Sequence, residues 1–194
     1  MKKKDAILSV ATVLFANKGF ADTSGQELAR VIGVAEGTIF YHFKSKEGLL
    51  LAILEKTRDE IEDQFERFFE NRPFDSGLEM AEEVVSFYLY LAGLMEDKFL
   101  LLHRHFLYKF SESNPEFRGN LEAIYNCLVD IFEKAIVTGQ EDGSINHEIH
   151  PRKSALILFT MVDGLVRFKN FNLYDAGALF NELMLTCRRM LQVP

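Results

Sequence analysis

Apolar residues recur three and four positions apart along almost the whole chain, the spacing that gathers them on one face of an α-helix. The alternation of apolar and polar residues that is typical of a β-strand is absent. Three of the four prolines, Pro73, Pro115 and Pro151, interrupt the periodicity where one helix can end and another begin. We therefore predict an all-α fold. The expected helices cover residues 3–18, 25–32, 36–42, 46–70, 77–95, 98–110, 115–139, 151–170 and 176–191.

The second and third of these helices are short, and Gly33-Val34-Ala35 joins them. Ser24 precedes the first of the pair and Glu27 follows three residues later, a capping box that marks a helix start. Two short helices joined by a short turn with glycine form a helix-turn-helix, whose second helix enters the major groove of DNA. The residues that we expect on the exposed face of this helix are Glu36, Gly37, Thr38, Tyr41 and His42.

The run from Thr23 to Leu50 is TSGQELARVIGVAEGTIFYHFKSKEGLL. It resembles the helix-turn-helix of the tetracycline-repressor (TetR) family, with its Thr-Ser start, its Gly-Val turn and its Gly-Thr-Ile-Phe and Lys-Glu segments. The rest of the chain matches that family only in layout, including an Asp163-Gly164-Leu165 step. The resemblance implies a three-helix DNA-binding head, residues 1–46, and a six-helix ligand-binding and dimerisation body, residues 47–194.

The resemblance also implies a role for individual residues of the head. Thr23 and Ser24 would touch phosphate, and Gln26 would reach a base or the DNA backbone. Lys46 would bind phosphate on the flank through a charge-assisted contact, strengthened by the dipole of the helix that begins there. The residues implied to contact DNA are Thr23, Ser24, Gln26, Glu36, Gly37, Thr38, Tyr41, His42 and Lys46.

Three positions of the head depart from the family pattern. Ala35 stands where serine or threonine is usual, so the second helix of the pair lacks a side-chain N-cap, which is worth about 1 kcal/mol. Glu36 brings an acid near phosphate, although a carboxylate can accept a hydrogen bond from cytosine N4. Phe40 lacks the hydroxyl of the tyrosine that is frequent there. These changes bear on affinity and sequence preference.

Two further sites are expected in the body. Residues with polar tips lie within apolar helix faces, which is typical of an apolar small-molecule pocket with a few polar groups. The candidate pocket residues are Tyr88, His103, Phe106, Tyr125 and Phe159. The last two helices carry more apolar surface than one helix pair can cover, and in the TetR family such helices pair across a two-fold axis. The candidate dimer residues are Leu156, Phe159, Val166, Leu179, Leu183, Met184 and Cys187.

Other kinds of site are not predicted. His103 and His105 are two positions apart, a spacing that does not share a helix face, so we expect no metal and no cofactor. The phosphate-binding and nucleophile motifs of common enzymes are missing, and we expect no enzyme activity. Cys127 and Cys187 lie in apolar stretches and are expected to be reduced. We expect a cytoplasmic protein without a membrane span, since the densest apolar run, 99–110, is short and charged.

The net charge of −7 would argue against a nucleic-acid partner if it were evenly spread. Residues 1–46 instead carry seven basic and four acidic side chains, among them Lys2, Lys3 and Lys4 in an N-terminal arm. We therefore predict a homodimeric regulator that binds double-stranded DNA at a palindromic operator and is released by a small hydrophobic or aromatic effector. The alternatives are an activator or a ligand-independent regulator, and an all-α carrier or enzyme with a vestigial helix-turn-helix.

Overall fold

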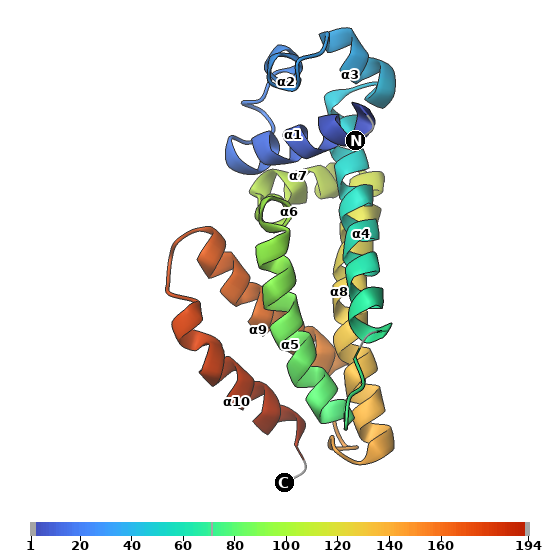
Figure 1. The fold of residues 1–194 in the computed structure, drawn as a ribbon, viewed down its shortest axis with the longest axis vertical. Helices are drawn as coiled ribbons and strands as arrows, with labels where there is room; N and C mark the ends of the chain where they lie inside the picture. Colours follow the sequence, from blue (N-terminus) through green and yellow to red (C-terminus); the bar gives the residue numbers. More distant parts are fainter. Residues whose placement is uncertain (1–2, 71, 193–194) are drawn as a thin grey trace. The chain divides into compact units, whose positions relative to one another are not determined.

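The computed structural model describes residues 3–70 and 72–192, which leaves Lys2 of the N-terminal arm outside the described residues. Within those ranges the chain forms helices without strands, which confirms the all-α prediction (Figure 1). The helices of the described residues are α1 (Lys3–Asn17), α2 (Gly25–Ile32), α3 (Glu36–Phe43), α4 (Lys46–Glu70), α5 (Gly77–Leu94), α6 (Glu96–Leu102), α7 (His105–Ser113), α8 (Pro115–Asp142), α9 (Pro151–Asn170), the 3-10 turn η1 (Gly177–Leu179) and α10 (Phe180–Leu191).

The single helix expected over 98–110 is wrong, because the structure has two helices there, α6 and α7. Arg104 has an extended backbone between them, with φ −76° and ψ 129°. Its Nε donates a hydrogen bond to the carbonyl of Ala16 at 2.5 Å, and its Nη2 donates to the carbonyl of Asn17 at 3.3 Å. The break therefore places a guanidinium on the last carbonyls of α1, which have no partner within their own helix.

The chain divides into two compact units. The first contains residues 1–60 and 96–124, and the second contains residues 61–95 and 125–194. Helices α4 and α8 each belong to both units. The boundaries of these two units do not coincide with the predicted division after residue 46. That the head is a domain of its own therefore stays a prediction.

In the first unit, α1 packs against α2 and α6 (Figure 1). The apolar face of α1 is fully buried at Ile7, Ala11 and Phe15. Leu50 and Ile53 of α4 are buried in the same unit. Because these residues recur at helical spacing, each helix turns one apolar face into the interior of the first unit.

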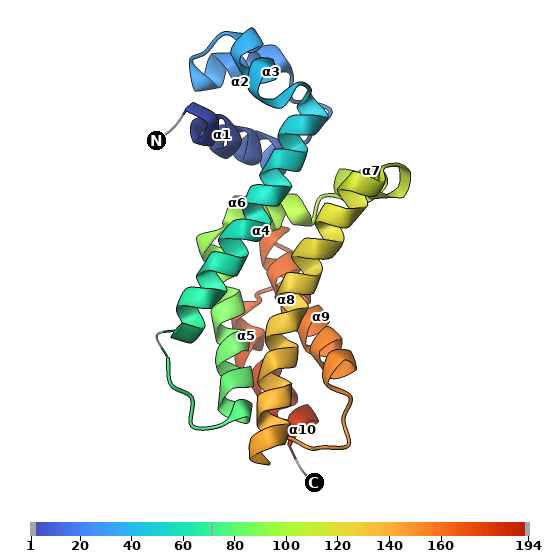
Figure 2. The ribbon, with the colours of Figure 1, turned by 90° about the vertical axis from the view of Figure 1, so that its right-hand side faces the viewer.

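In the second unit, α10 packs on α5 and α9, and α5 packs on α9. Figure 2 shows the beginning of α5 beside the end of α8. There Gly77 touches the backbone of Gly139 so closely that a side chain would not fit. Gly77 N–H donates to Asp142 Oδ2 at 2.6 Å, which gives α5 an anionic cap from another helix.

Candidate nucleic-acid interface

Helices α2 and α3 form the expected helix-turn-helix, and local signals define its ends. Ser24 Oγ accepts a hydrogen bond from the N–H of Glu27 at 3.1 Å, as the capping box predicts. Gly33 ends α2 with φ 77°, a left-handed conformation that suits glycine. As expected, Ala35 gives α3 no side-chain cap. The buried side chains of Leu28 and Ile39 anchor the two helices in the core of the first unit.

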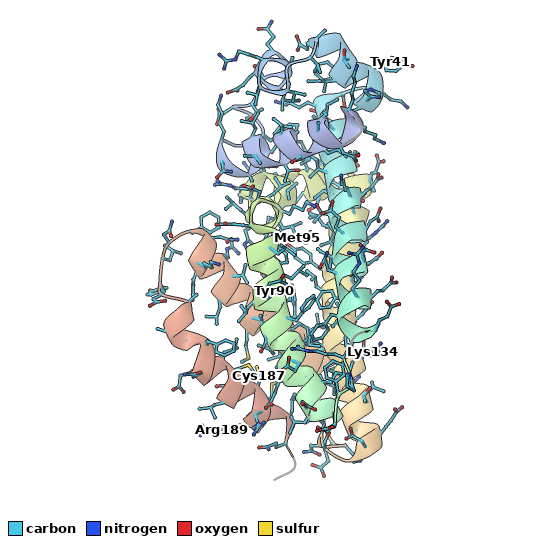
Figure 3. The ribbon with its side chains drawn as sticks, in the orientation of Figure 1. Tyr41, Tyr90, Met95, Lys134, Cys187 and Arg189 are labelled. Atoms are coloured by element: carbon cyan, nitrogen blue, oxygen red, sulfur yellow. The ribbon has the colours of Figure 1, made fainter. Side chains whose placement is uncertain are left out.

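The outward face of α3 carries the side chains that were expected to meet DNA. Tyr41 is 84% exposed, and Figure 3 shows its ring directed away from the ribbon. His42 is also exposed, and its ring centroid lies 5.4 Å from that of Tyr41. Gly37 is exposed with open space beside it, so α3 can approach a groove closely at this point. Thr38 is half-buried on the same helix.

The residues that begin α2 divide into exposed and buried positions. Ser24 and Gln26 are exposed, so both can meet a ligand as large as DNA. Thr23 is fully buried, and its hydroxyl donates to the carbonyl of Gly19 at 2.8 Å. The Thr23 hydroxyl therefore stabilises the turn before α2, and the phosphate contact expected of Thr23 stays a prediction.

Two charged residues of the head point toward protein. Glu36 is half-buried, and its carboxylate lies directly against Gly25, where it would collide with any added side chain. Lys46 Nζ donates to the carbonyl of Phe20 at 2.8 Å and to that of Thr23 at 3.0 Å. The same ammonium lies 4.3 Å from the centre of the Phe20 ring. Sequence reasoning missed these contacts, since nothing in the motif distinguishes a carbonyl from a phosphate as the partner of a lysine.

An ion pair further reduces the free positive charge of the head. Lys18 Nζ lies 2.5 Å from Glu27 Oε2. The hydrogen bond from Lys18 is the main cause that lowers the pKa of the Glu27 carboxyl, and burial opposes it. Lys3, Arg30 and Lys44 are exposed and remain available to phosphate.

Three of the five predicted pocket residues meet in the second unit. The ring centroid of Phe159 lies 6.0 Å from that of Tyr88 and 5.9 Å from that of Tyr125. The buried hydroxyl of Tyr88 donates to Asp163 Oδ1 at 2.8 Å. These contacts bring three aromatic rings and the carboxylate of Asp163 together. Asp163 was not among the predicted pocket residues and was named only within the Asp163-Gly164-Leu165 match to the TetR family.

The other two predicted pocket residues lie in the first unit. His103 is buried directly after the end of α6. The ring centroid of Phe106 lies 5.8 Å from that of Phe20 and 6.3 Å from that of Phe110. Phe106 therefore belongs to an aromatic cluster beneath the head.

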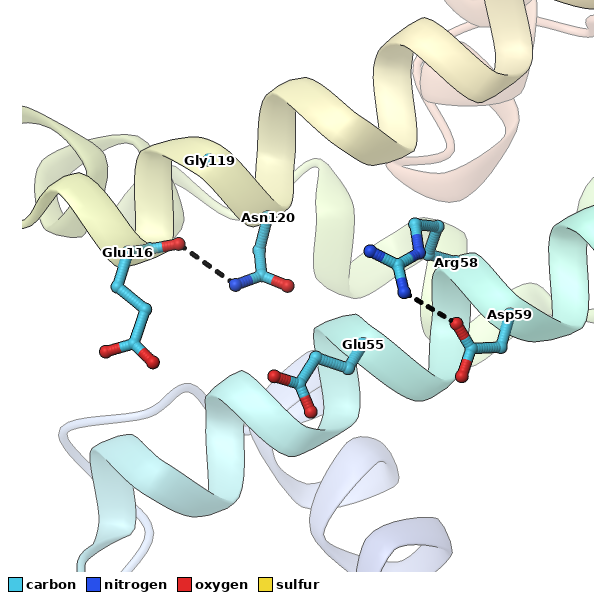
Figure 4. Close-up of a pocket in the computed structure, with 6 residues that line it drawn as sticks. All are labelled: Glu55, Arg58, Asp59, Glu116, Gly119 and Asn120. Carbon is cyan, nitrogen blue, oxygen red and sulfur yellow. Dashed lines mark hydrogen bonds and ion pairs between the residues drawn. The ribbon is translucent and has the colours of Figure 1, made fainter.

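A polar cleft of about 350 Å³ opens between α4 and α8 in the first unit (Figure 4). None of the predicted pocket residues lines it. Arg58 Nη2 donates to Asp59 Oδ1 at 2.9 Å, and Asn120 Nδ2 donates to the Glu116 carbonyl at 3.0 Å, so these side chains partner their own helices. The lining residues are Glu55, Arg58, Asp59, Glu116, Gly119 and Asn120.

The residues expected at a dimer interface differ in how far they are exposed to solvent. Val166, Leu183 and Cys187 are buried within the chain, so they pack in its own core, and their part in a dimer interface stays a prediction. Burial is the main cause that raises the pKa of the Cys187 thiol to about 11. Leu156 is 45% exposed and Leu179 is 40% exposed, so both side chains are open to contact from outside the chain. Met184 and Phe159 are half-buried.

The outer face of α9 and α10 contains two further large apolar residues that sequence reasoning did not single out. Ile157 is 52% exposed on α9, and Leu185 is 46% exposed on α10. Gly164 has open space beside it on α9, so the backbone of another helix could approach closely. Periodicity identified an apolar face correctly but could not separate residues that face α5 from residues that face outward.

No group of three or more histidine, cysteine, aspartate or glutamate side chains within 3–70 and 72–192 is arranged to hold a metal ion. In those same ranges no helix combines the length and the apolar character needed to cross a bilayer.

The head matches a known family of proteins. Residues 7–53 match the family described as "Bacterial regulatory proteins, tetR family", a stretch that includes α2, α3 and the start of α4. The uncharacterized HTH-type transcriptional regulator YerO of Bacillus subtilis (strain 168) is 48% identical over 54 residues. Those residues are 28% of this chain and 19% of YerO, so this likeness covers only a small part of either protein.

Other proteins are similar over nearly the full length. The fatty acid metabolism regulator protein of Bacillus subtilis (strain 168) is 23% identical over 180 residues, which are 92% of this chain and 90% of that protein. A transcriptional regulator from Saccharomonospora viridis, crystallised with choline, has a TM-score of 0.86, 21% identity and 98% coverage of both chains. The regulator FadR from Bacillus subtilis, crystallised with stearoyl-CoA, has a TM-score of 0.76, 22% identity, and coverage of 94% of this chain and 96% of that one. These structural likenesses establish a shared fold.

Proposed function

Because the chain belongs to the TetR family of DNA-binding transcriptional regulators, we propose that it is a homodimeric repressor released from a palindromic operator by a small molecule. The observation that carries this proposal is the exposed face of α3, where Tyr41, His42 and Gly37 stand outward on a helix-turn-helix. A helix presented in this way can enter a major groove with its side chains near base edges.

DNA contact in this proposal comes from the outward face of α3 and the start of α2. Gly37, Thr38 and Tyr41 of α3 face the groove, while Ser24 and Gln26 at the start of α2 contact the DNA backbone. The exposed cations of the head supply the attraction to phosphate, which is independent of sequence and sensitive to salt. The carboxylate of Glu36 is turned against Gly25, and this supports a packing role for it in place of a base contact.

A second copy of the chain is the occupant that we propose for the outer face of α9 and α10. Leu156, Ile157, Leu179 and Leu185 are large and exposed there, and Gly164 permits close approach of a helix. A two-fold dimer presents two heads to half-sites one helical turn or a multiple apart, which is the geometry of a palindromic operator.

The effector that we propose is a small hydrophobic or aromatic molecule. Its binding region would include the Tyr88, Tyr125 and Phe159 cluster, with Asp163 as a polar partner. Regulators of this fold have been crystallised with choline and with stearoyl-CoA, two small molecules of different chemistry. Effector binding would shift the population toward a conformation in which the heads no longer match successive grooves. Helix α4 is continuous through both units and is the proposed lever.

Selection of bound sequences from a random DNA library, with the purified full-length chain, tests the proposal. We expect an enriched palindrome, and we expect Tyr41→Ala to weaken binding to it by about 1–3 kcal/mol while relaxing the preference at nearby bases. Tyr90→Ala is the matched control, because Tyr90 is 62% exposed on α5 in the second unit (Figure 3).

Three outcomes would contradict parts of the proposal. Failure to enrich any sequence would favour a carrier or enzyme with a vestigial helix-turn-helix. A selected operator whose deletion lowers expression of the adjacent gene would indicate an activator. Equal losses for Tyr41→Ala and Tyr90→Ala would show that α3 does not recognise the sequence.

A further inference from the structure

We propose that Lys46 is a positioning residue for DNA recognition, which holds the turn before α2 in place and makes no phosphate contact of its own. The inference rests on the proposed function, because it assigns a role within sequence-specific DNA binding. It replaces the phosphate contact that the family resemblance implies for this lysine.

The surroundings of the ammonium group account for its hydrogen-bonding capacity. A lysine ammonium has three N–H donors. Two of them are directed to the carbonyls of Phe20 and Thr23, at 2.8 Å and 3.0 Å. The ammonium also lies 4.3 Å from the centre of the Phe20 ring, within the range of a cation–π interaction. A phosphate at Lys46 could therefore use only the remaining N–H, in competition with the Phe20 ring and the two carbonyls.

The two carbonyls belong to the turn that leads from α1 into α2. Within this turn the N–H of Thr23 donates to the Phe20 carbonyl at 3.4 Å, and the Thr23 hydroxyl donates to the Gly19 carbonyl at 2.8 Å. Thr23 directly precedes Ser24, the N-cap of α2. By holding both carbonyls, Lys46 ties the first residues of α2, including Gln26, to the start of α4.

The Phe20 side chain also holds the turn in place, because its ring packs against other aromatic rings. Its ring centroid lies 5.1 Å from that of Phe15 and 5.0 Å from that of Phe110. Phe20 is 7% exposed, so the ring beneath the ammonium is fixed by the core of the first unit. The start of α2 is thus fixed between a buried aromatic cluster and a cation, both supplied by the protein itself.

Salt dependence separates a positioning role from a phosphate contact. Each phosphate neutralised by a cation contributes about 0.9 to the slope of log Kd against log salt concentration. We expect Lys46→Met to weaken operator binding at least tenfold and to leave this slope at the wild-type value. Binding to random-sequence duplex should change less than twofold, because the exposed cations of the head remain. Lys44→Met is the matched control for loss of one positive charge, since Lys44 is exposed two positions earlier.

Two more variants keep the test decisive if Lys46→Met lowers stability. Lys46→Arg retains donors for the two carbonyls, and we expect it to restore much of the ratio between operator and random-sequence binding. Phe20→Leu removes the ring without removing a charge, and we expect it to lower that ratio as Lys46→Met does. Circular dichroism at the assay temperature confirms that each variant is folded. Hydrogen exchange should be faster at the amides of residues 20–24 in Lys46→Met.

The proposal is overturned if Lys46→Met reduces the salt slope by about 0.9 per protomer and weakens operator and random-sequence binding equally. It is also overturned if Phe20→Leu leaves the ratio between the two unchanged. Failure of the wild-type chain to prefer any DNA sequence would refute the proposed function. That result can be told apart from the Lys46→Met and Phe20→Leu outcomes, which concern the variants only.

Discussion

The contact between Gly77 and Gly139 gives the sharpest prediction for the stability of the second unit. A Cβ added to Gly77 would lie 2.7 Å from the backbone carbonyl carbon of Thr138, and closer still to Gly139. Because these neighbours are backbone atoms, α5 itself must move away from α8. Overpacking of this kind costs about 1–3 kcal/mol.

The displacement would also disturb two hydrogen bonds at the start of α5. Gly77 N–H donates to Asp142 Oδ2 at 2.6 Å, and Leu78 N–H donates to Ser144 Oγ at 3.0 Å. Each such bond contributes about 0.5–1.5 kcal/mol. The higher helix propensity of alanine offsets about 0.5–1 kcal/mol. We expect Gly77→Ala to lower the free energy of unfolding by roughly 2 kcal/mol, which corresponds to a fall in Tm of about 4–8 °C in a chain of this size.

Thermal and urea unfolding followed by circular dichroism would measure this effect. Gly119→Ala is the matched control, because Gly119 is an exposed helical glycine of α8 with no neighbouring atom within 4 Å of an added Cβ. We expect Gly119→Ala to be neutral or to stabilise the chain by up to about 1 kcal/mol. A Gly77→Ala variant as stable as the Gly119→Ala variant would refute the reasoning.

Three other predictions concern the second unit. Ile157→Asp should convert a dimer to a monomer in sedimentation analysis, whereas Val137→Asp, at a position 39% exposed on α8, should not. Tyr88→Phe should lower the free energy of unfolding, measured by urea denaturation, by about 1–2 kcal/mol, since it removes a buried hydrogen bond to a carboxylate. Hydrogen bonds from the Ser144 side chain and then from the Gly77 N–H lower the pKa of Asp142, so its stabilisation is present above its unfolded-state pKa and is lost as pH falls through the folded value. Asp142→Asn should therefore lower Tm at pH 7 and have no effect in strong acid.

Much of the fold could be predicted from the sequence, because most helix ends depend on signals within a few residues. Ser24 and Gly33 bound α2 through local hydrogen bonds, and Pro115 begins α8 as expected. The break between α6 and α7 could not be predicted in this way. Arg104 bonds to carbonyls of α1 that lie 87 and 88 positions away in the sequence, and apolar periodicity carries no information about such partners.

The candidate site shows the same limit at the level of single side chains. The exposure of Tyr41 and Gly37 follows from helical spacing in a recognised motif. The internal use of Lys46, Thr23 and Glu36 does not, because a motif records which residue type is suitable and not which atoms it contacts. Burial of Val166 and Cys187 was missed for a related reason. Their helices have apolar residues on more than one face, and only packing decides which face meets the same chain.

These internal contacts also set an upper bound on the salt dependence of DNA binding. Seven basic side chains lie in residues 1–46, but Lys46 is held by carbonyls and Lys18 is paired with Glu27. At most five cations of the head then remain for phosphate, so the slope of log Kd against log salt concentration should not exceed about 4.5 per protomer. Titration of operator DNA at several salt concentrations measures this slope. A steeper slope would mean that cations outside residues 1–46 reach the DNA, or that Lys46 and Lys18 leave their partners when the head binds.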